Sequence, residues 1–271
     1  MLDGVDALAA GFDTIAELYE QARPSYPAAL FEDLAALTGP PDRAGRVLEV
    51  GPGTGQATRG LLRGGWIVDA VEPGHRLAAV ARRVLAGRGE VRVHVAPFET
   101  WEPGDRRFDL VFAATAWHWL DPAVAHRKAA GLLLPGGHLA AVSTEHVLPR
   151  PGGDDFFVLA DEVYRDVGLD DGRGPPFRQE DVAAPEVDAI ASSGHFGPPV
   201  VRRYLWSQRY TEREYLRLLG TYSGHLAATD EQRGALYARL GELIRARPGG
   251  VVRKHYLNVL HVAEKLDRFA S

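Results

Sequence analysis

The sequence contains no cysteine among its 271 residues. This absence excludes disulfide bonds, thiolate zinc sites, iron–sulfur clusters and a cysteine nucleophile. No run of about 20 apolar residues is present either, so we expect no membrane-spanning helix. The first six residues carry two acids, at Asp3 and Asp6, where a secretory signal peptide would carry lysine or arginine. We therefore expect a soluble, cytoplasmic protein.

A strong positive charge is also missing, because 31 Lys and Arg residues face 36 Asp and Glu residues and give a net charge of −5. Such a balance does not attract nucleic acid or anionic lipid, so we expect neither as a partner. The ten histidines are scattered, and no two lie one helical turn apart beside an acid. The acid nearest the expected fourth-strand loop is Asp121, which is better explained as a helix cap. We therefore expect no metal.

Residues 47–143 alternate between short apolar runs and helix-like segments. Asp121 and Pro122 form a good helix start, an acidic cap followed by proline at the first helical position. Strand–helix alternation over this length predicts an α/β fold, in which a parallel sheet carries helices on both faces. The expected strands of this part of the chain are 47–50, 67–71, 91–95, 108–113 and 139–142.

The C-terminal part predicts two further strands separated by helices. Residues 200–210 alternate and place Tyr204, Trp206 and Tyr210 on one face, and residues 251–262 predict a last strand. Two capping boxes, at 211–214 and 229–232, mark helix starts between them. We therefore expect this part to join the same sheet and not to form an independent domain.

The chemical centre of the sequence is a glycine turn between a strand and a helix, with glycines at 51, 53 and 55. Such a turn lets a ligand approach the backbone closely. Glu72 follows 21 residues after Gly51, at the end of the second expected strand. A carboxylate at that position can accept hydrogen bonds from ribose hydroxyls, so the pair indicates an adenosine-type ligand.

The spacing around the turn favours one adenosine ligand over others. A dinucleotide site needs G-x-G-x-x-G, but the third glycine comes one residue early and Gln56 follows it. No Lys-Ser/Thr pair follows the turn, which excludes a P-loop. Glu49, two residues before the first glycine, would repel phosphates, whereas S-adenosylmethionine carries a sulfonium and an ammonium and suits a nearby acid. A nicotinamide-dependent oxidoreductase and a protein that binds S-adenosylmethionine without transferring methyl remain alternatives.

With these residues the chain resembles a class I S-adenosylmethionine-dependent methyltransferase. The matching pieces are 47–55, 71–73, 108–121 and 133–139. The opening segment 12–27, with Tyr19 and an Arg-Pro-x-Tyr-Pro string, resembles that of trans-aconitate-type small-molecule methyltransferases.

The resemblance implies a Rossmann-like, doubly wound, mostly parallel seven-stranded sheet with an N-terminal helical segment and a small helical cap. It further implies a cofactor-covering segment over 1–40, a cofactor-binding core over 41–145, and cap helices with the last two strands over 146–271.

The resemblance also implies which residues hold the cofactor. The glycines wrap its methionine part, Glu49 holds the ammonium and Glu72 the ribose. Phe98 and Glu99 border the adenine, although Pro97 stands where a common variant has aspartate. The full expected set is Tyr19, Arg23, Glu49, Gly51, Gly53, Gly55, Glu72, Pro73, Phe98, Glu99, Ala114 and Thr115.

The implied reaction is in-line methyl transfer to O, N or C of a small organic molecule, with S-adenosyl-L-homocysteine as product. His118 is the first candidate for a base, with His146, His195 and His225 as alternatives, and core packing is the competing explanation for each. RNA or protein methylation is a further alternative, and the sequence leaves monomer and homodimer open. The candidate acceptor-binding residues are Tyr26, Trp117, Trp119, Trp206 and Tyr222.

Overall fold

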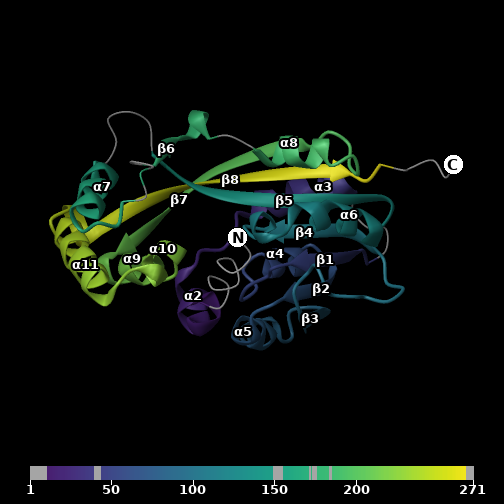
Figure 1. The fold of residues 1–271 in the computed structure, drawn as a ribbon, viewed down its shortest axis with the longest axis horizontal. Helices are drawn as coiled ribbons and strands as arrows, with labels where there is room; N and C mark the ends of the chain where they lie inside the picture. The colour runs from purple at the N-terminus through teal and green to yellow at the C-terminus, as the bar shows by residue number, and fades with distance from the viewer. Residues whose placement is uncertain are drawn as a thin grey trace.

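The structure is a computed structural model, and it describes residues 11–39, 44–148, 155–170, 172, 176–182 and 185–266. Its centre is a single twisted sheet (Figure 1). Strand-forming segments are the apolar runs that the sequence indicates, because the inner strands of a parallel sheet are covered on both faces. The strands are β1 (Arg46–Val50), β2 (Ile67–Glu72), β3 (Val91–Val95), β4 (Phe108–Ala114), β5 (Leu133–Leu148), β6 (Phe177–Arg178), β7 (Val200–Thr211) and β8 (Val251–Glu264).

The sheet follows the order β3-β2-β1-β4-β5-β8-β7, and the two-residue β6 pairs with β5 off this path. Strands β1 to β5 pair in parallel, and β8 runs antiparallel to both β5 and β7. The chain reverses its strand order at β1, next to β4, so the carboxyl ends of these two strands open a crevice. The expected mostly parallel, seven-stranded Rossmann-like sheet is confirmed.

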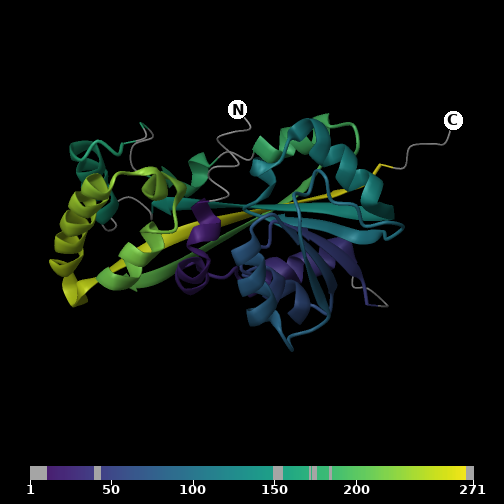
Figure 2. The ribbon, with the colours of Figure 1, turned by 60° about the horizontal axis from the view of Figure 1, so that its bottom comes forward.

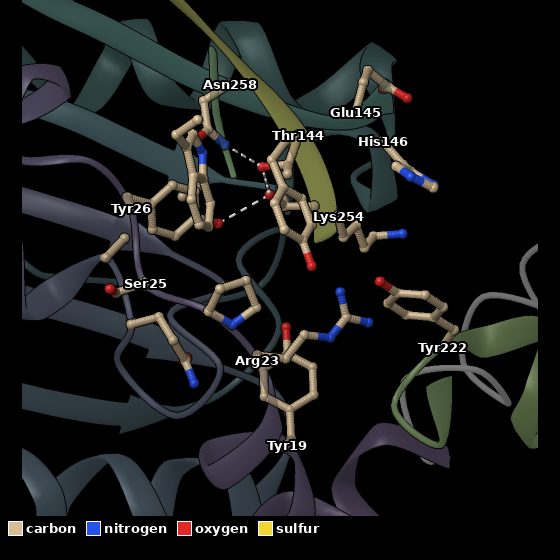
Figure 3. A pocket seen from close by; sticks show the side chains of 18 of the residues that line it. Tyr19, Arg23, Ser25, Tyr26, Thr144, Glu145, His146, Tyr222, Lys254 and Asn258 are labelled. Carbon is tan, nitrogen blue, oxygen red and sulfur yellow. Dashed lines mark hydrogen bonds between the residues drawn. The ribbon is translucent and has the colours of Figure 1, made fainter. Parts of the chain in front are cut away.

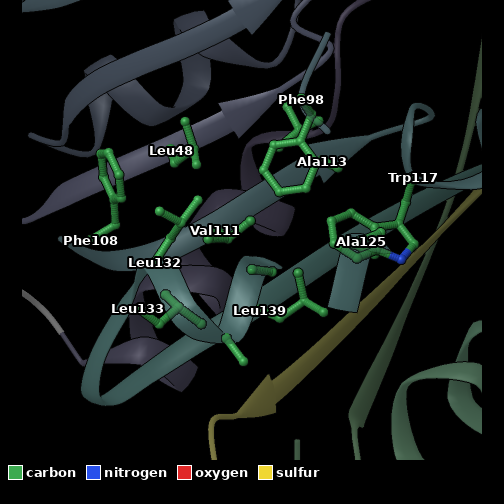
Figure 4. Packing of buried hydrophobic residues seen from close by; sticks show 14 of the residues in the cluster. Leu48, Phe98, Phe108, Val111, Ala113, Trp117, Ala125, Leu132, Leu133 and Leu139 are labelled. Atoms are coloured by element: carbon green, nitrogen blue, oxygen red, sulfur yellow. The ribbon is translucent and has the colours of Figure 1, made fainter. Parts of the chain in front are cut away.

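Helices cover both faces of the parallel half. One face packs against α3 and α4 through a cluster that includes Leu34 and Leu61, and the other packs against α6 through Leu48, Val111 and Ala125 (Figure 4). Period-two alternation in the strands divides neighbouring residues between these layers. The α-helices are α2 (Ala16–Ala22), α3 (Ala28–Thr38), α4 (Thr58–Arg63), α5 (His75–Leu85), α6 (Pro122–Leu132), α7 (Phe156–Asp166), α8 (Pro185–Ser192), α9 (Glu212–Leu219), α10 (Ser223–Ala227) and α11 (Asp230–Arg245).

The strands β5, β7 and β8 continue beyond the parallel half and carry a second group of helices. Figures 1 and 2 show α7, α9, α10 and α11 gathered at the far end of these strands. Their shared cluster includes Phe156 and Leu240, and it also takes in Tyr210 from β7 and Val252 from β8. This cap is therefore built on the same sheet, as the sequence indicates. Both expected capping boxes are present, at the starts of α9 and α11.

Local differences from the expectations have simple causes. The helix after the glycine turn begins at Thr58, because residues up to Ala57 are still in turns and Gly55 has a φ of 95°. The expected strand 139–142 is part of the longer β5, which already begins at Leu133 and contains an irregularity where Leu133 pairs with Phe108 but His138 pairs with Leu110. Among the described residues, no helix combines the length and apolar character that crossing a membrane requires.

Candidate functional site

The glycine turn lies at the carboxyl end of β1, where the strand order reverses. Gly51, Gly53 and Gly55 all have positive φ, which side chains rarely tolerate. A Cβ atom on Gly51 would lie 2.6 Å from the Cβ of Ala116, so this position has no space for a side chain. The turn is therefore closed by backbone alone, and its amides stay accessible to a neighbouring carboxylate.

That carboxylate is Glu72, at the end of β2. Its Oε2 accepts a hydrogen bond from the Gly53 amide and its Oε1 accepts one from the Gly74 amide, both at 2.9 Å. Burial raises the pKa of Glu72 to about 7, against the lowering effect of the two amides. Each oxygen keeps further capacity to accept, which a ribose hydroxyl would use. Glu72 thus ties the glycine turn to β2 at the place where the sequence predicts the ribose.

Glu49 is a buried acid in an otherwise apolar strand. Its side chain is 1% exposed, and its Oε2 has no hydrogen-bond partner among the described residues. Burial raises the pKa of Glu49 to about 7, with the nearby charge of Glu72 acting in the same direction and the Thr58 side chain acting against it. A buried carboxylate with one unpartnered oxygen is costly, so its presence beside the glycine turn favours a cationic ligand there.

Helix α2 packs over the turn through Glu20. Its carboxylate accepts hydrogen bonds from the Thr54 hydroxyl at 2.8 Å and the Gln56 amide at 3.3 Å, and it pairs with Arg59. Both Thr54 and Gln56 are buried. Side-chain contacts therefore fix the N-terminal segment to the glycine turn. From the sequence we expected this segment only to cover the cofactor.

Arg23, one residue beyond α2, connects this segment to the cap. It donates from Nε to the Thr221 hydroxyl at 2.8 Å and from Nη2 to the Thr221 carbonyl at 2.6 Å. Its guanidinium carbon lies 5.0 Å from the ring centre of Tyr19 and 4.6 Å from that of Tyr222. The cation is thus held between two aromatic rings.

A cavity of about 460 Å³ opens between the glycine turn, the N-terminal segment and the cap. Figure 3 shows that the side chains labelled there come from the N-terminal segment, from the long strands β5 and β8, and, for Tyr222, from the cap. The structure therefore brings together residues expected for the cofactor and residues expected for the acceptor. Those expected residues are Tyr19, Arg23, Tyr26, Glu49, Gly51, Ala114, Thr115, Trp206 and Tyr222.

A chain of hydrogen bonds crosses one wall of this cavity (Figure 3). The Thr115 hydroxyl lies 3.0 Å from the Tyr26 hydroxyl and 3.1 Å from that of Thr144, and Thr144 accepts from Asn258 at 2.7 Å. Asn258 in turn accepts from the Trp206 indole at 2.6 Å. Thr115 has a φ of 57°, which is strained for a β-branched residue. These hydrogen bonds fix the Thr115 hydroxyl at the end of β4, next to the expected cofactor residue Ala114.

Sequence reasoning missed the polar face of β8. Lys254, Tyr256 and Asn258 are all buried and all line the cavity. Their spacing of two places them on one face of the strand, so this alternation is the pattern that could have found them. The other missed lining residues include Thr144, Glu145 and Pro176.

Other expected cofactor residues lie around the cavity without lining it. Phe98 is buried in the sheet-and-helix core, and the Glu99 carboxylate accepts from the Asp121 amide at 3.2 Å. Gly53, Gly55 and Glu72 lie in or behind the glycine turn, and Pro73 is exposed after β2. Their roles stay predictions.

The Trp-His-Trp string forms a 3₁₀ turn at 117–119, and its three side chains lie in different surroundings. Trp117 is buried and donates to His126 at 3.3 Å, whereas Trp119 lies at the surface against Phe12. His118 is exposed, and none of the three lines the cavity. The catalytic role of His118 and the acceptor roles of Trp117 and Trp119 therefore stay predictions, while His146 does line the cavity.

No group of three or more histidine or acidic side chains suited to a metal occurs within the described ranges. The expectation that the protein uses no metal stays a prediction.

Comparison with known proteins bears on the segment that holds the glycine turn and Glu72. Residues 48–141 match the model of the family described as "Methyltransferase domain". This segment is a methyltransferase domain. It spans β1 to the middle of β5, and so contains the glycine turn, Glu49, Glu72 and Thr115.

Relatives of the methyltransferase domain cover part or most of the chain. An uncharacterized methyltransferase of Mycobacterium tuberculosis is 37% identical over 131 residues, which are 48% of this chain and 51% of the relative. A protein of Anaeromyxobacter dehalogenans, solved as a candidate type II methyltransferase, gives a TM-score of 0.63 at 24% identity, over 89% of this chain and 97% of that one. The chain thus spans about half the length of the curated relatives it matches.

A third comparison is with phosphoethanolamine N-methyltransferase 2 of Haemonchus contortus, solved with phosphomonomethylethanolamine and S-adenosylhomocysteine. Its TM-score is 0.52 at 17% identity, over 94% of this chain and 58% of that one. At these identities the two solved structures establish the shared fold of the methyltransferase domain.

Proposed function

We propose that the protein transfers a methyl group from S-adenosyl-L-methionine to a nucleophilic atom of a small organic molecule. The observation that carries the proposal is Glu49, a buried carboxylate without a partner for Oε2, placed on a cavity beside a glycine turn. The methyltransferase domain around it supports the choice of cofactor. The trans-aconitate-type resemblance and the roles of individual residues remain predictions within this proposal.

The residues present fit the cofactor. Glu49 would hold its ammonium group, and the backbone of the turn at Gly51, which lines the cavity, would pass close to the methionine part. Glu72 would accept from the ribose hydroxyls. When bound, S-adenosylmethionine supplies an activated methyl group on a sulfonium. Tyr19 and Arg23, which also line the cavity, would close the methionine end.

The protein's own part is to position the acceptor and to exclude water. Alignment of two reactants can account for roughly 7–11 kcal/mol of a reaction barrier. The hydrogen-bonded chain from Tyr26 to Asn258 is suited to this task, because each hydroxyl in it is held by a neighbour. We infer that residues 41–145 serve the cofactor, that 1–40 cover it, and that 146–271 form the acceptor side.

Titration calorimetry tests the cofactor. Wild-type protein is titrated with S-adenosylmethionine, S-adenosylhomocysteine and NAD, in parallel with Glu49→Gln and Glu72→Ala. We expect both adenosyl ligands to bind and NAD not to bind. Glu49→Gln weakens binding at least tenfold because it removes a charged partner of the ammonium, and Glu72→Ala does so because it removes the ribose acceptor.

Glu90→Gln is the matched control, since Glu90 is exposed immediately before β3, away from the cavity, and pairs with the exposed Arg92. Its affinities should equal those of the wild type. Binding of NAD alone would replace the proposal with a nicotinamide-dependent oxidoreductase, and equal affinity in all three variants would remove Glu49 and Glu72 from the site.

A further inference from the structure

Lys254 is a buried lysine on the acceptor side of the cavity. Its side chain is 3% exposed, and its ammonium lies 5.7 Å from the ring centre of Phe157 and 5.5 Å from those of Tyr222 and Tyr256. Three aromatic faces around an ammonium favour its charged form. The rings supply no strong hydrogen-bond acceptor, however, and an ammonium has three donors to satisfy.

Within the described part of the chain, no acid pairs with Lys254, and no hydrogen bond joins its ammonium to the side chains around it in Figure 3. Burial lowers the pKa of Lys254 to about 7, and the positive charge of Arg23 acts in the same direction. Figure 3 shows Lys254, Arg23 and Tyr222 gathered at one end of the cavity. A buried cation beside a second cation is stabilised by an anion that enters with a ligand.

Lys254 also lies where two cavities meet. A second cavity of about 430 Å³ extends into the cap, and it shares His146, Tyr222 and Lys254 with the first. Apolar and aromatic side chains such as Phe157 and Leu219 line its walls. A ligand can therefore reach from the end of β4 past Lys254 into a space whose walls are largely apolar or aromatic.

The charged groups around the two cavities favour a ligand that carries a single negative charge. Burial is the main cause that lowers the pKa values of His146 and His225, with the charge of Lys254 acting in the same direction, so both rings are neutral near pH 7. Asp161 and Asp170 line the second cavity and oppose a doubly charged phosphate.

Resting on the proposed function, we propose that the methyl acceptor is an organic monoanion. Its carboxylate pairs with Lys254, and its apolar or aromatic body fills the adjoining space between the two cavities. The carboxylate serves as an anchor, and the atom that receives the methyl group lies nearer to Thr115.

The test compares carboxylates with their own uncharged amides. Phenylacetate, 3-phenylpropanoate, hexanoate and octanoate are titrated into the protein saturated with S-adenosylhomocysteine, each beside its primary amide, with phenyl phosphate as a further probe. We expect the best carboxylate to bind at least ten times more tightly than its amide. This comparison needs only the wild-type protein. A preference for phenyl phosphate overturns the assignment of a single charge.

Variants then locate the anion. Lys254→Met and Lys254→Gln should each abolish the preference for carboxylate while leaving the affinity for S-adenosylhomocysteine unchanged. Arg253→Met removes the same charge from the neighbouring, exposed position of β8 and should keep the preference.

Equal binding of carboxylates and amides, or a preference that survives in both Lys254 variants, overturns this inference alone. Absence of S-adenosylhomocysteine binding in the wild type overturns the proposed function instead.

Discussion

At the scale of single residues, the two buried acids around the glycine turn, Glu49 and Glu72, lower the free energy of unfolding when they ionise. Glu49 and Glu72 are buried close enough for the charge of Glu72 to raise the pKa of Glu49, and burial raises the pKa of each to about 7. Between pH 4.5 and 7 the folded protein therefore binds more protons at these sites than the unfolded chain does. The free energy of unfolding accordingly falls as the pH rises through this range.

Replacing Glu49 with glutamine removes this penalty. We expect Glu49→Gln to raise the free energy of unfolding at pH 8 by on the order of 1–3 kcal/mol in the cofactor-free protein, and to change it little at pH 4.5. Urea unfolding at the two pH values measures the difference. The exposed Glu90→Gln should match the wild type at both, and a Glu49→Gln protein that is less stable than the wild type at pH 8 would contradict the buried-charge argument.

At the scale of elements, α2 holds the two halves of the site together. Glu20 contacts the glycine turn and α4, and Gln21 bonds to Arg217 on α9. The exposed pair between Glu17 and Arg83 adds a contact to α5. Because surface ion pairs contribute little, the partly buried contacts of Glu20 should dominate.

Glu20→Ala tests that ranking. It removes the carboxylate that accepts from the buried Thr54 and Gln56 and, among the described residues, leaves these two side chains only the hydrogen bonds to each other. We therefore expect the free energy of unfolding to fall by about 1–3 kcal/mol and the affinity for S-adenosylhomocysteine to fall with it. Glu17→Ala on the same helix should change the free energy of unfolding far less, because its ion pair with Arg83 is exposed. Denaturant unfolding and calorimetry measure both quantities, and equal effects of the two variants would show that α2 does not fix the turn through Glu20.

Local chemistry made part of the site predictable. The positive-φ glycines, the acid at the end of β2 and the caps at Thr211 and Thr229 depend on neighbours within a few residues, and the sequence therefore indicates them. The contact of Glu20 with Thr54 joins positions 34 residues apart and depends on tertiary packing. Lys254 depends on the pairing of β8 with β5 and β7, which no local pattern specifies.

At the scale of the whole molecule, β5, β7 and β8 join the cap to the rest of the sheet. The cap cluster includes residues of these strands, so its packing is continuous with the sheet. Elements that share strands and a core usually unfold together. We therefore expect one unfolding transition for the cap and the methyltransferase domain.

A substitution inside the cap tests this coupling. Leu240 on α11 is fully buried, so Leu240→Ala should lower the free energy of unfolding by about 2–5 kcal/mol. Helix content by circular dichroism and tryptophan fluorescence, which comes mostly from residues 66, 101, 117 and 119 outside the cap, should report the same lower midpoint. Arg239→Ala, which removes an exposed pair with Asp166, is the control and should cost less than about 1 kcal/mol. Two separate midpoints in Leu240→Ala would mean that the cap unfolds alone.

The regular rise per residue of β8 relates positions along this strand to the length of the acceptor molecule. Asn258 is bonded to Thr144 near the end of β4, and Lys254 stands four residues back along the strand, roughly 13 Å away at about 3.3 Å per residue. On the proposed function, that interval sets the length between the anchored charge and the methylated atom. Because side chains on one face recur every second residue, the available lengths come in steps of about 7 Å. Moving the cation from position 254 to 256 would therefore select an acceptor shorter by one such step.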